Sequence, residues 1–486
     1  MKKLYRFSAI ALLVLPLIFT SCSDYLDRDD DDNITEADVF ARYEKVNGLV
    51  SDVYAAAKKA DRPLVFFEHF SNSAITDECE GTNVEGNITN NFNNGAWNPN
   101  SLPGSVGQYW EALYEGIRKA NLIIENVQKY NTPDNPQQDG DLRNRIGEMY
   151  FMRGYFHMLL LRMYGEAPYI DRVINAGDNM DFKKESVHSM VEKIVTDAQT
   201  AYGMVPNKYV KTSENFGRVD KGACLGLISF VRWVAATPLW NGASQYGYNL
   251  RRVFENEYAY DATRWRKAKE AAKAVLDFEV GGTKRYSLYT KHDANDFKDP
   301  ADGNLNDSRV YARLWDMFYD MDAFANEYVF FMTKSKDQAW QGDIYPPSRE
   351  GSSRQQPVQE QVDEYEYIVG DYGYPVYSAE ARKGGYDDTN PYVKGTRDPR
   401  FYRDVIYHGA PYRNNKNESK TINTASGSDK IGATNATTTG YYLRKFQQES
   451  WNKSGNFSIN APAIWRLPEF IYIYAEACNE LGEDID

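Results

Sequence analysis

Apolar residues recur at spacings of three and four along several long stretches of the chain, which is the period of an amphipathic α-helix. The first such stretch covers residues 36–60, and Thr35 directly before it is suited to cap a helix N-terminus. We therefore predict one amphipathic helix here. Its apolar stripe consists of Val39, Phe40, Tyr43, Val46, Leu49, Val50, Val53 and Tyr54.

The same period returns in six later segments. They cover residues 108–130, the stretch from Asp141 to a stop at Gly165 and Pro168, and residues 186–202, 221–236, 262–277 and 466–481. The helix after Asp141 is apolar almost all round, but Arg153 and Arg162 interrupt it, so the pattern favours a buried helix over a membrane span. Most of these helices form pairs joined by short turns. The segment WEALYEGI loosely fits the opening of a tetratricopeptide repeat through Trp110, Leu113, Tyr114 and Ile117.

Two regions lack the helical period. Residues 61–107 contain nine Asn between Asn72 and Asn100, which predicts a long loop. Residues 281–460 are rich in Tyr, Gly, Asn, Asp and Pro, with an isolated strand predicted at the apolar run 328–332 and an exposed polar insertion at 413–440. We therefore predict a mainly α protein whose helical scaffold (36–280 and 461–486) carries an irregular, loop-rich subdomain (281–460). Binding residues concentrate on such loops.

The N-terminus has the pattern of a secretion signal. Three basic residues precede the apolar run 7–20, which is about 14 residues long and too short to cross a hydrocarbon core of roughly 30 Å comfortably. Cys22 follows Ser21 at the end of this run, which resembles the site at which bacterial lipoproteins are cleaved and acylated, although Phe19 stands where that site prefers Leu. We predict a lipoprotein signal over residues 1–21, lipidation of Cys22 and an acidic tether over residues 22–35. Ordinary secretion is the alternative.

Net charge and composition argue against nucleic-acid binding and favour a ligand that contacts aromatic rings. The chain of 486 residues has a formal net charge of −13, and cleavage after Ser21 would shift it to −16 because residues 1–21 carry three positive charges and no negative one. A negative charge opposes nucleic-acid binding, so no nucleic-acid partner is expected. Aromatic residues make up 14% of the chain, with 37 Tyr, 23 Phe and 9 Trp. Because this exceeds what a core of this size requires, we expect some of the rings to face a ligand.

Cysteine and histidine patterns indicate no cofactor. Cys79, Cys224 and Cys478 have no CxxC spacing, and the last two lie in apolar helical patterns that predict burial. The five His are scattered and are expected to have structural or surface roles. Two acidic stretches, Asp77 to Glu80 and Asp293 to Asp307, leave calcium open as an alternative, but neither follows the EF-hand spacing.

No catalytic motif stands out. The chain has no HExxH, GxSxG, P-loop or GxGxxG signature. Because no sequence feature indicates catalysis, we predict that the protein is not an enzyme. Carboxylates are too numerous to nominate a glycosidase pair, since that assignment depends on a separation in space.

Nine segments in order resemble the SusD/RagB family. They are CSDYLD, YWEALYEGIRKANLIIE, GEMYFMRGYFHMLLLRMYGEAPYI, GRVDKGACLGLISFVRW, RWRKAKEAAKAVLD, NEYVFF, QQPVQEQVDEYE, RDPRFYRDVIYHG and RLPEFIYIYAEACNELG. The resemblance runs from Cys22 to the end of the chain. It implies a tetratricopeptide-like scaffold with an irregular subdomain, and a surface lipoprotein of the outer membrane that captures oligosaccharide or polysaccharide. It also implies a SusC-like, TonB-dependent outer-membrane transporter as partner, and further helix and tail beyond Asp486.

We predict the glycan-binding residues from the chemistry of a sugar and from the resemblance to the family. A pyranose needs flat aromatic platforms for its C–H faces and planar polar groups for its hydroxyls. Two loops that match the family's ligand loops supply both kinds of group, and residues 315 and 319 are candidates to join them. The predicted glycan-binding residues are Trp97, Asp77 and Asn98 in the first loop, Trp340, Tyr345 and Arg349 in the second, and Trp315 and Tyr319.

Alternatives remain for these rings and for the whole protein. Each ring could instead anchor its loop to the helical body. By contrast, Trp110, Trp233, Trp265 and Trp465 lie on helical periods and are expected in the core. The chain could also be an interaction module that binds only the transporter, or a glycoside hydrolase.

Overall fold

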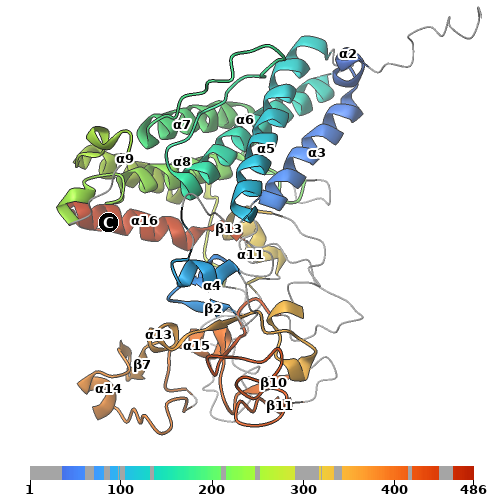
Figure 1. The fold of residues 1–486 in the computed structure, drawn as a ribbon. Coiled ribbons are helices and arrows are strands. Elements are labelled where there is room, and N and C mark those ends of the chain that lie inside the picture. The colour runs from blue at the N-terminus through green and yellow to red at the C-terminus, as the bar shows by residue number, and fades with distance from the viewer. Residues whose placement is uncertain are drawn as a thin grey trace, which may run out of the picture.

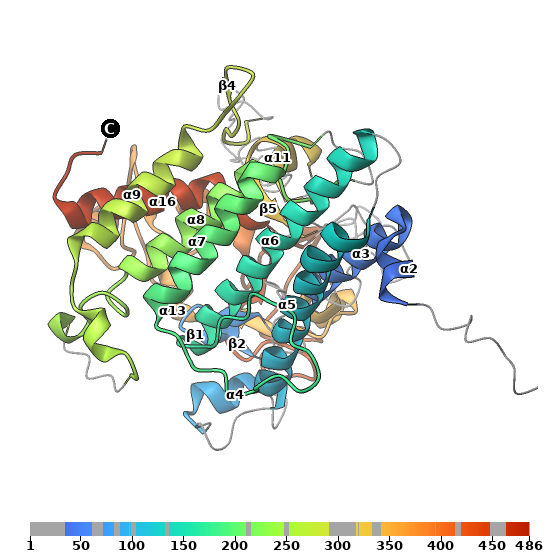
Figure 2. The same cartoon turned by 90° about the horizontal axis from the view of Figure 1, so that it is seen from above.

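The helices of the scaffold follow one another in space in the order of the chain. The computed structural model describes residues 35–60, 71–81, 88–96, 98, 104–131, 136–209, 215–246, 252–290, 317–318, 320–332, 342–393, 395–413, 419–447 and 463–485. Each scaffold helix packs on the next, and the C-terminal helix α16 packs on α9, which closes the series (Figure 1, Figure 2). The series comprises α2 (Glu36–Phe40), α3 (Tyr43–Ala60), α5 (Gly104–Tyr130), α6 (Pro136–Tyr164), α7 (Val187–Met204), α8 (Lys221–Ala236), α9 (Ala262–Leu276) and α16 (Leu467–Leu481).

Local signals in the sequence set the ends of these helices. Thr35 forms a capping box with Asp38: its hydroxyl accepts the Asp38 amide at 3.2 Å, and its own amide donates to the Asp38 carboxylate at 2.9 Å. Ser186, Asp220 and Asp261 each cap their helix, α7, α8 and α9, through a side-chain oxygen. The helix predicted over residues 36–60 is broken at 41–42, where the freed carbonyl of Phe40 accepts a hydrogen bond from the Asn131 side chain at 2.9 Å.

The C-terminus of α6 requires a glycine. Gly165 has a φ of +71°, a left-handed conformation that other residues adopt only at a cost. A Cβ atom at this position would also meet the Trp240 ring at 2.9 Å. The stop predicted from Gly165 and Pro168 is therefore confirmed by both conformation and packing.

Helix α6 forms the centre of the scaffold core. It is buried on nearly all sides, as its uniform apolar pattern predicts, and Arg153 in its middle is only 7% exposed. The predicted burial of Cys224 and Cys478 is also confirmed. Across the described helices, none combines the length and the apolar character that a membrane crossing requires.

One strand pair joins the scaffold to the rest of the chain. The predicted strand at 328–332 is present as β5 (Tyr328–Phe331), which pairs antiparallel with β13 (Ala463–Arg466) directly before α16. Val329 and Phe330 pack into the scaffold core, where α8 presents Gly226. A Cβ at Gly226 would lie 2.9 Å from the Val329 side chain, so this glycine allows the strand to approach the helix.

The remaining segments form an appendage of short elements below the scaffold (Figure 1). Its three-stranded sheet has the order β1-β2-β6, with β1 (Ile75–Thr76), β2 (Cys79–Gly81) and β6 (Gln355–Pro357) all antiparallel. The other strand pairs are β7 (Tyr367–Val369) with β8 (Tyr372–Tyr374), β9 (Val405–Ile406) with β12 (Tyr442–Leu443), and β10 (Pro411–Arg413) with β11 (Ser419–Thr421). Short helices are α4 (Ile88–Asn93), α11 (Met321–Asn326), α13 (Gln359–Asp363), α14 (Ala379–Lys383) and α15 (Pro399–Asp404). A small hairpin, β3 (Glu279–Val280) and β4 (Thr283–Lys284), follows α9.

Aromatic rings form the core of the appendage. Phe401 stacks on Tyr392 and Tyr407 with ring centroids 5.6 and 5.3 Å apart, and Tyr402 and Tyr442 are fully buried beside them. Part of the aromatic surplus therefore packs a region that has few aliphatic residues. The fold is mainly α with a tetratricopeptide-like scaffold and an irregular appendage, as predicted.

The boundary between the scaffold and the appendage differs at two places from the boundary predicted from the sequence. Residues 71–93, placed by sequence with the scaffold, contribute β1, β2 and α4 to the appendage side, where β2 pairs with β6. Conversely β5, placed by sequence with the loop-rich subdomain, packs into the scaffold core.

Candidate functional site

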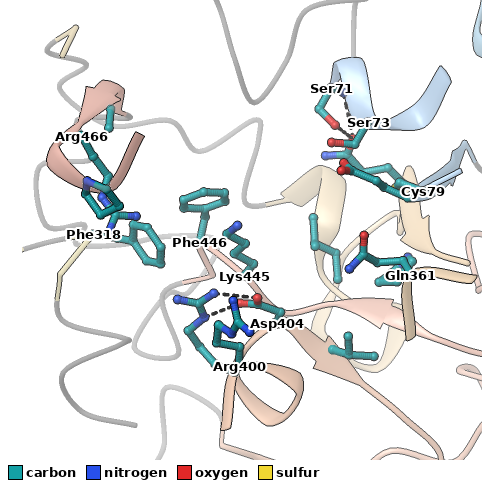
Figure 3. Close-up of a pocket in the computed structure, with 18 of the residues that line it drawn as sticks. Ser71, Ser73, Cys79, Phe318, Gln361, Arg400, Asp404, Lys445, Phe446 and Arg466 are labelled. Carbon is teal, nitrogen blue, oxygen red and sulfur yellow. Dashed lines mark hydrogen bonds and ion pairs between the residues drawn. The ribbon is translucent and has the colours of Figure 1, made fainter. Parts of the chain in front are cut away.

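A cavity of about 720 Å³ lies between the scaffold and the appendage, and we call it the scaffold–appendage cavity (Figure 3). The scaffold contributes β13 and the first residues of α16. The appendage contributes the segment 71–79, β6, α15 and residues 443–446. This volume is within the range of small-molecule sites in proteins. The polar residues that line it are Ser71, Ser73, Glu78, Tyr328, Gln355, Gln361, Tyr365, Arg400, Arg403, Asp404, Lys445, Arg466, Glu469 and Tyr472.

Strand pairing brings the first and second parts of the cavity wall together. β2 pairs with β6 in the register Cys79 to Pro357 and Gly81 to Gln355. The Gln355 side chain accepts hydrogen bonds from both the amide and the hydroxyl of Ser71, at 2.8 and 2.7 Å. These contacts fasten the first irregular region to a segment 284 residues later in the chain.

Three arginines on the wall are neutralised by carboxylates. Arg403 donates to Asp404 at 2.6 Å, and Tyr365 donates to the same carboxylate at 3.0 Å. Arg466 donates to Glu327 at 2.9 Å, which ties β13 to the residue before β5. Arg400 pairs with Asp398 at 2.5 Å at the start of α15. The charge of each guanidinium is thus already compensated.

Three other carboxyl or amino groups on the wall have no such compensation. Among the described residues, the Lys445 ammonium and the carboxyls of Glu78 and Glu469 take part in no side-chain hydrogen bond or ion pair. Burial lowers the pKa of Lys445, and the nearby Asp404 carboxylate opposes this effect. Burial raises the pKa of Glu469 to about 7, although Arg162 and Arg466 act in the other direction.

The raised pKa of Glu469 predicts a pH-dependent stability. An unfolded glutamate ionises near pH 4.3, so the stability that the folded chain loses through ionisation of Glu469 builds up between this value and about pH 7 and is complete above pH 7. We expect Glu469→Gln to raise the free energy of unfolding at pH 8 by roughly 1 kcal/mol, less than the full shift implies because water screens a half-buried carboxyl. The gain should disappear by pH 4, where wild-type Glu469 is protonated.

Urea unfolding at pH 4, 6 and 8 measures this effect. Glu480→Gln is the matched control, because Glu480 is exposed on the same helix, and it should change stability by less than about 0.5 kcal/mol at every pH. A Glu469→Gln gain that is equal at pH 4 and pH 8 would contradict the assignment.

Five of the residues nominated from sequence lie outside the described residues. These are the candidate platforms Trp97, Trp340, Trp315 and Tyr319, and the lipidation site Cys22. The roles given to them stay predictions.

Asp77 and Asn98 are exposed, as a ligand contact requires. Asp77 lies in the turn between β1 and β2, next to Glu78 of the cavity wall. The α4 helix is held to this turn region through Asn93, whose side chain donates to the carbonyl of Ala74 at 3.1 Å. The first predicted loop therefore places Asp77 at the edge of the cavity.

Tyr345 and Arg349 of the second predicted loop are buried. Tyr345 is 2% exposed and belongs to the aromatic core of the appendage with Phe401 and Tyr442. Arg349 is 9% exposed at the end of the 3₁₀ turn Pro347–Arg349, whose Ser348 amide donates to Asp429 at 2.8 Å. The burial of both side chains agrees with the alternative given above, in which they anchor their loop to the protein.

Several residues of the cavity wall were not nominated from the sequence. Lys445, Asp404, Gln361, Glu469 and Tyr472 come from four segments, three of which belong to the family-like blocks. Those blocks gave a sequence signal for all of them except Lys445, and no spacing along the chain predicts that they share one cavity.

The four tryptophans expected in the core differ in burial. Trp265 and Trp465 are 2% exposed, which confirms their place in the core, whereas Trp110 and Trp233 are only half-buried against it. Trp110 packs on the rings of Tyr114 and Tyr164, and the Trp233 indole donates to Glu476 at 2.7 Å. A tryptophan on a helical period can thus lie at the edge of the core when its N–H needs a partner.

Two histidines have structural roles. His157 is fully buried, and burial lowers its pKa to about 3, so its ring is neutral. Its Nε2 accepts the Ile170 amide at 3.0 Å, which leaves Nδ1–H to donate to the carbonyl of Arg153 at 2.8 Å. His188 is similarly bonded to the carbonyl of Trp240, and burial lowers its pKa to about 4.

Neither calcium candidate gains support. Within the described ranges, no three His, Cys, Asp or Glu side chains are grouped so as to hold a metal ion, and these ranges include the stretch Asp77 to Glu80. The second acidic stretch, Asp293 to Asp307, lies outside the described residues.

Solved structures of SusD-like proteins share this fold, an array of paired helices with a loop-rich appendage. A family model described as "Starch-binding associating with outer membrane" matches residues 24–231, and a model described as "SusD family" matches residues 313–485. The chain belongs to the SusD/RagB family, a family of SusD-like carbohydrate-binding proteins.

Individual relatives are distant in sequence. SusD-like protein P2 of Formosa agariphila is 24% identical over 202 residues, a match that spans 41% of this chain and 38% of that protein. A crystal structure of a SusD-like protein from Bacteroides fragilis has a TM-score of 0.69 and 18% identity, with 93% of this chain and 77% of that chain covered. The structure of a protein described as a "Laminarin binding SusD-like protein" has a TM-score of 0.51 and 16% identity, with 91% and 81% covered. At these identities the structural similarities show the fold.

Proposed function

We propose that this protein is a surface-exposed, non-catalytic glycan-binding lipoprotein that captures oligosaccharides and passes them to a TonB-dependent outer-membrane transporter. Family membership over both parts of the chain is the observation that carries the proposal. One of the structurally similar proteins is described as binding laminarin, a polysaccharide, which supports the same class of ligand here.

The site chemistry agrees with a saccharide ligand. The exposed turn at Asp77 and the edge of the scaffold–appendage cavity adjoin one another, and β2–β6 pairing fixes that edge. The wall combines aromatic rings with amide, hydroxyl and charged groups, the mixture that satisfies both the C–H faces and the hydroxyls of a sugar. We assign the stacking contacts to Trp97 and Trp340, with Trp315 and Tyr319 as further candidates.

The anchor and the partner follow from the same proposal. Lipidation at Cys22 with more than one acyl chain would hold the protein stably at the outer membrane, since a single chain binds only marginally. Mass spectrometry of the N-terminal peptide from the membrane fraction tests this step. We assign the outer surface of the helical scaffold to the transporter, which leaves the loops free for cargo.

A glycan array followed by affinity electrophoresis tests the function. We expect the purified protein to bind at least one class of neutral or acidic polysaccharide, with laminarin as the first probe, and its migration to be retarded in gels that contain the bound glycan. Prolonged incubation should release no reducing ends. Absence of binding to every glycan would favour the pure interaction module, and turnover that a carboxylate variant abolishes would favour the hydrolase.

A further inference from the structure

The scaffold–appendage cavity contains polar side chains that the protein itself leaves unpaired. Among the described residues, the side chains of Ser73, Gln361 and Lys445 and the carboxyls of Glu78 and Glu469 line the cavity and make no hydrogen bond or ion pair with another side chain or with the backbone. In Figure 3, Lys445 and Phe446 lie between Arg466 and Phe318 on one side and Cys79 and Gln361 on the other. Groups that are partly removed from water without a protein partner are suited to meet a polar ligand.

Lys445 differs from the other cations on this wall. Arg400, Arg403 and Arg466 each have a carboxylate partner, as described above, so an incoming anion would compete with an existing ion pair. Lys445 is held by its backbone amide, which donates to the carbonyl of Asp404, and its ammonium lies 5.2 Å from the centre of the Phe446 ring. It is therefore the wall cation whose charge an anionic ligand would compensate without breaking a bond.

Two aromatic rings, Phe446 and Phe318, form an apolar wall beside Lys445. Phe446 has a φ of +65°, a conformation that costs a non-glycine residue about 1 kcal/mol or more and that is common at ligand clamps. Its ring meets Phe318 edge to face with centroids 4.4 Å apart, which gives the cavity an apolar wall beside the ammonium. Tyr472, 71% exposed on α16, stands at the rim.

We propose that the scaffold–appendage cavity binds an acidic pyranose unit, with Lys445 pairing to its carboxylate or sulfate, Phe446 covering its C–H face, and Gln361 and Ser73 bonding its hydroxyls. This inference rests on the proposed glycan-binding function and gives it a substrate class. The residues of this subsite are distinct from the tryptophans nominated as platforms. It makes acidic oligosaccharides the preferred cargo.

Titration calorimetry with three β-1,4-linked disaccharides tests the inference. The probes are cellobiose, cellobiouronic acid and cellobiose 6′-sulfate, which share one linkage and differ in charge. We expect one or both acidic probes to bind about 10- to 100-fold more tightly than cellobiose, the range for a hydrogen bond to a charged group. The two acidic arms distinguish a carboxylate from a sulfate ligand.

Three variants locate the effect. Lys445→Met keeps most of the length of the side chain and removes its charge, and it should reduce the acidic preference to about twofold or less, whereas Lys445→Arg should retain it. Lys430→Met is the matched control, because Lys430 is an exposed lysine of the same appendage, and it should behave as wild type. Thermal melting verifies that all three variants fold.

The outcomes separate this inference from the proposed function. Glycan binding on the array with equal affinity for acidic and neutral disaccharides overturns the inference alone. A preference that persists in Lys445→Met overturns it as well, since another cation would then hold the anion. A protein that binds no saccharide of any kind overturns both.

Discussion

Replacing Asp197 with alanine is expected to lower the free energy of unfolding by about 3 to 5 kcal/mol, the cost of leaving a buried charge without its partner. Arg153 of α6 donates to both carboxylate oxygens of Asp197 on α7, at 2.7 and 2.5 Å, and both side chains are less than a tenth exposed. Tyr169 donates to the same carboxylate at 2.6 Å. The variant would leave the guanidinium in the core with too few acceptors.

The pair also ties three helices together. Arg153 donates to the Asn121 side chain of α5 at 2.9 Å, and Asn121 in turn donates to the carbonyls of Ile170 and Arg172. Loss of Asp197 should therefore loosen the connection after α6 as well as the contact with α7. We expect a lower urea midpoint and increased protease sensitivity near residues 165–173.

Two controls isolate the buried charge. The double variant Arg153→Met, Asp197→Leu removes both charges and should recover much of the lost stability, because well-packed apolar replacements of buried ion pairs are often neutral. Asp181→Ala breaks the exposed pair with Lys183, whose side chains are 67% and 81% exposed, and should cost no more than about 1 kcal/mol. If the free energy of unfolding of Asp197→Ala lies within about 1 kcal/mol of the wild-type value, the network does not stabilise the scaffold as described.

Replacing Trp340 or Trp97 with alanine is expected to weaken glycan binding about 5- to 150-fold, which corresponds to roughly 1 to 3 kcal/mol for the loss of an aromatic hot spot. The reason is chemical: a sugar presents apolar C–H faces, and an indole is the largest flat surface that a side chain offers. Affinity electrophoresis on the glycan identified by the array measures the effect. The melting temperature should hardly change, since exposed substitutions alter stability by under about 0.5 kcal/mol.

The control for these variants comes from the structure. Trp265→Ala should cost about 3 to 5 kcal/mol of stability, because Trp265 is 2% exposed in the contact between α9 and its neighbours. Trp110 is less suitable for this comparison, since it is only half-buried. If Trp340→Ala and Trp97→Ala both unfold the protein, while the folded remainder keeps full glycan affinity, the rings anchor their loops and the assignment of the site is wrong.

Most helix ends were predicted to within two residues, whereas α5 and α6 begin four and five residues before the predicted starts at 108 and 141. The helix predicted at 221–236 has the same bounds in the structure, and those predicted at 186–202, 262–277 and 466–481 differ from it by at most two residues at either end. The period of apolar residues and the capping side chains act within one or two helical turns, so a single sequence contains them. The break after Phe40 was missed because a distant side chain, Asn131, stabilises it.

Which rings lie in a core and which face solvent was harder to predict. Tyr345 was nominated as a platform because it lies in a loop that resembles a ligand loop of the family, yet it is packed among the rings of the appendage core. In a region with few aliphatic residues, tyrosines serve as core and as surface alike, and composition does not tell the two roles apart. Burial depends on what other segments cover the ring.

The sequence by itself determined the helical scaffold, its caps, the buried character of α6 and the resemblance to a glycan-binding family, because each of these is encoded in neighbouring residues or in ordered blocks. Only the tertiary structure decided that residues 71–79, 355–361, 400–404, 443–446 and 463–472 surround one cavity, and that Lys445 stands in it without a counterion among the described residues. The physical reason is that pairing of β2 with β6, β5 with β13 and β9 with β12 joins segments far apart in the chain. Such pairing depends on the packing and hydrogen bonding of the whole chain, and no local sequence pattern predicts it.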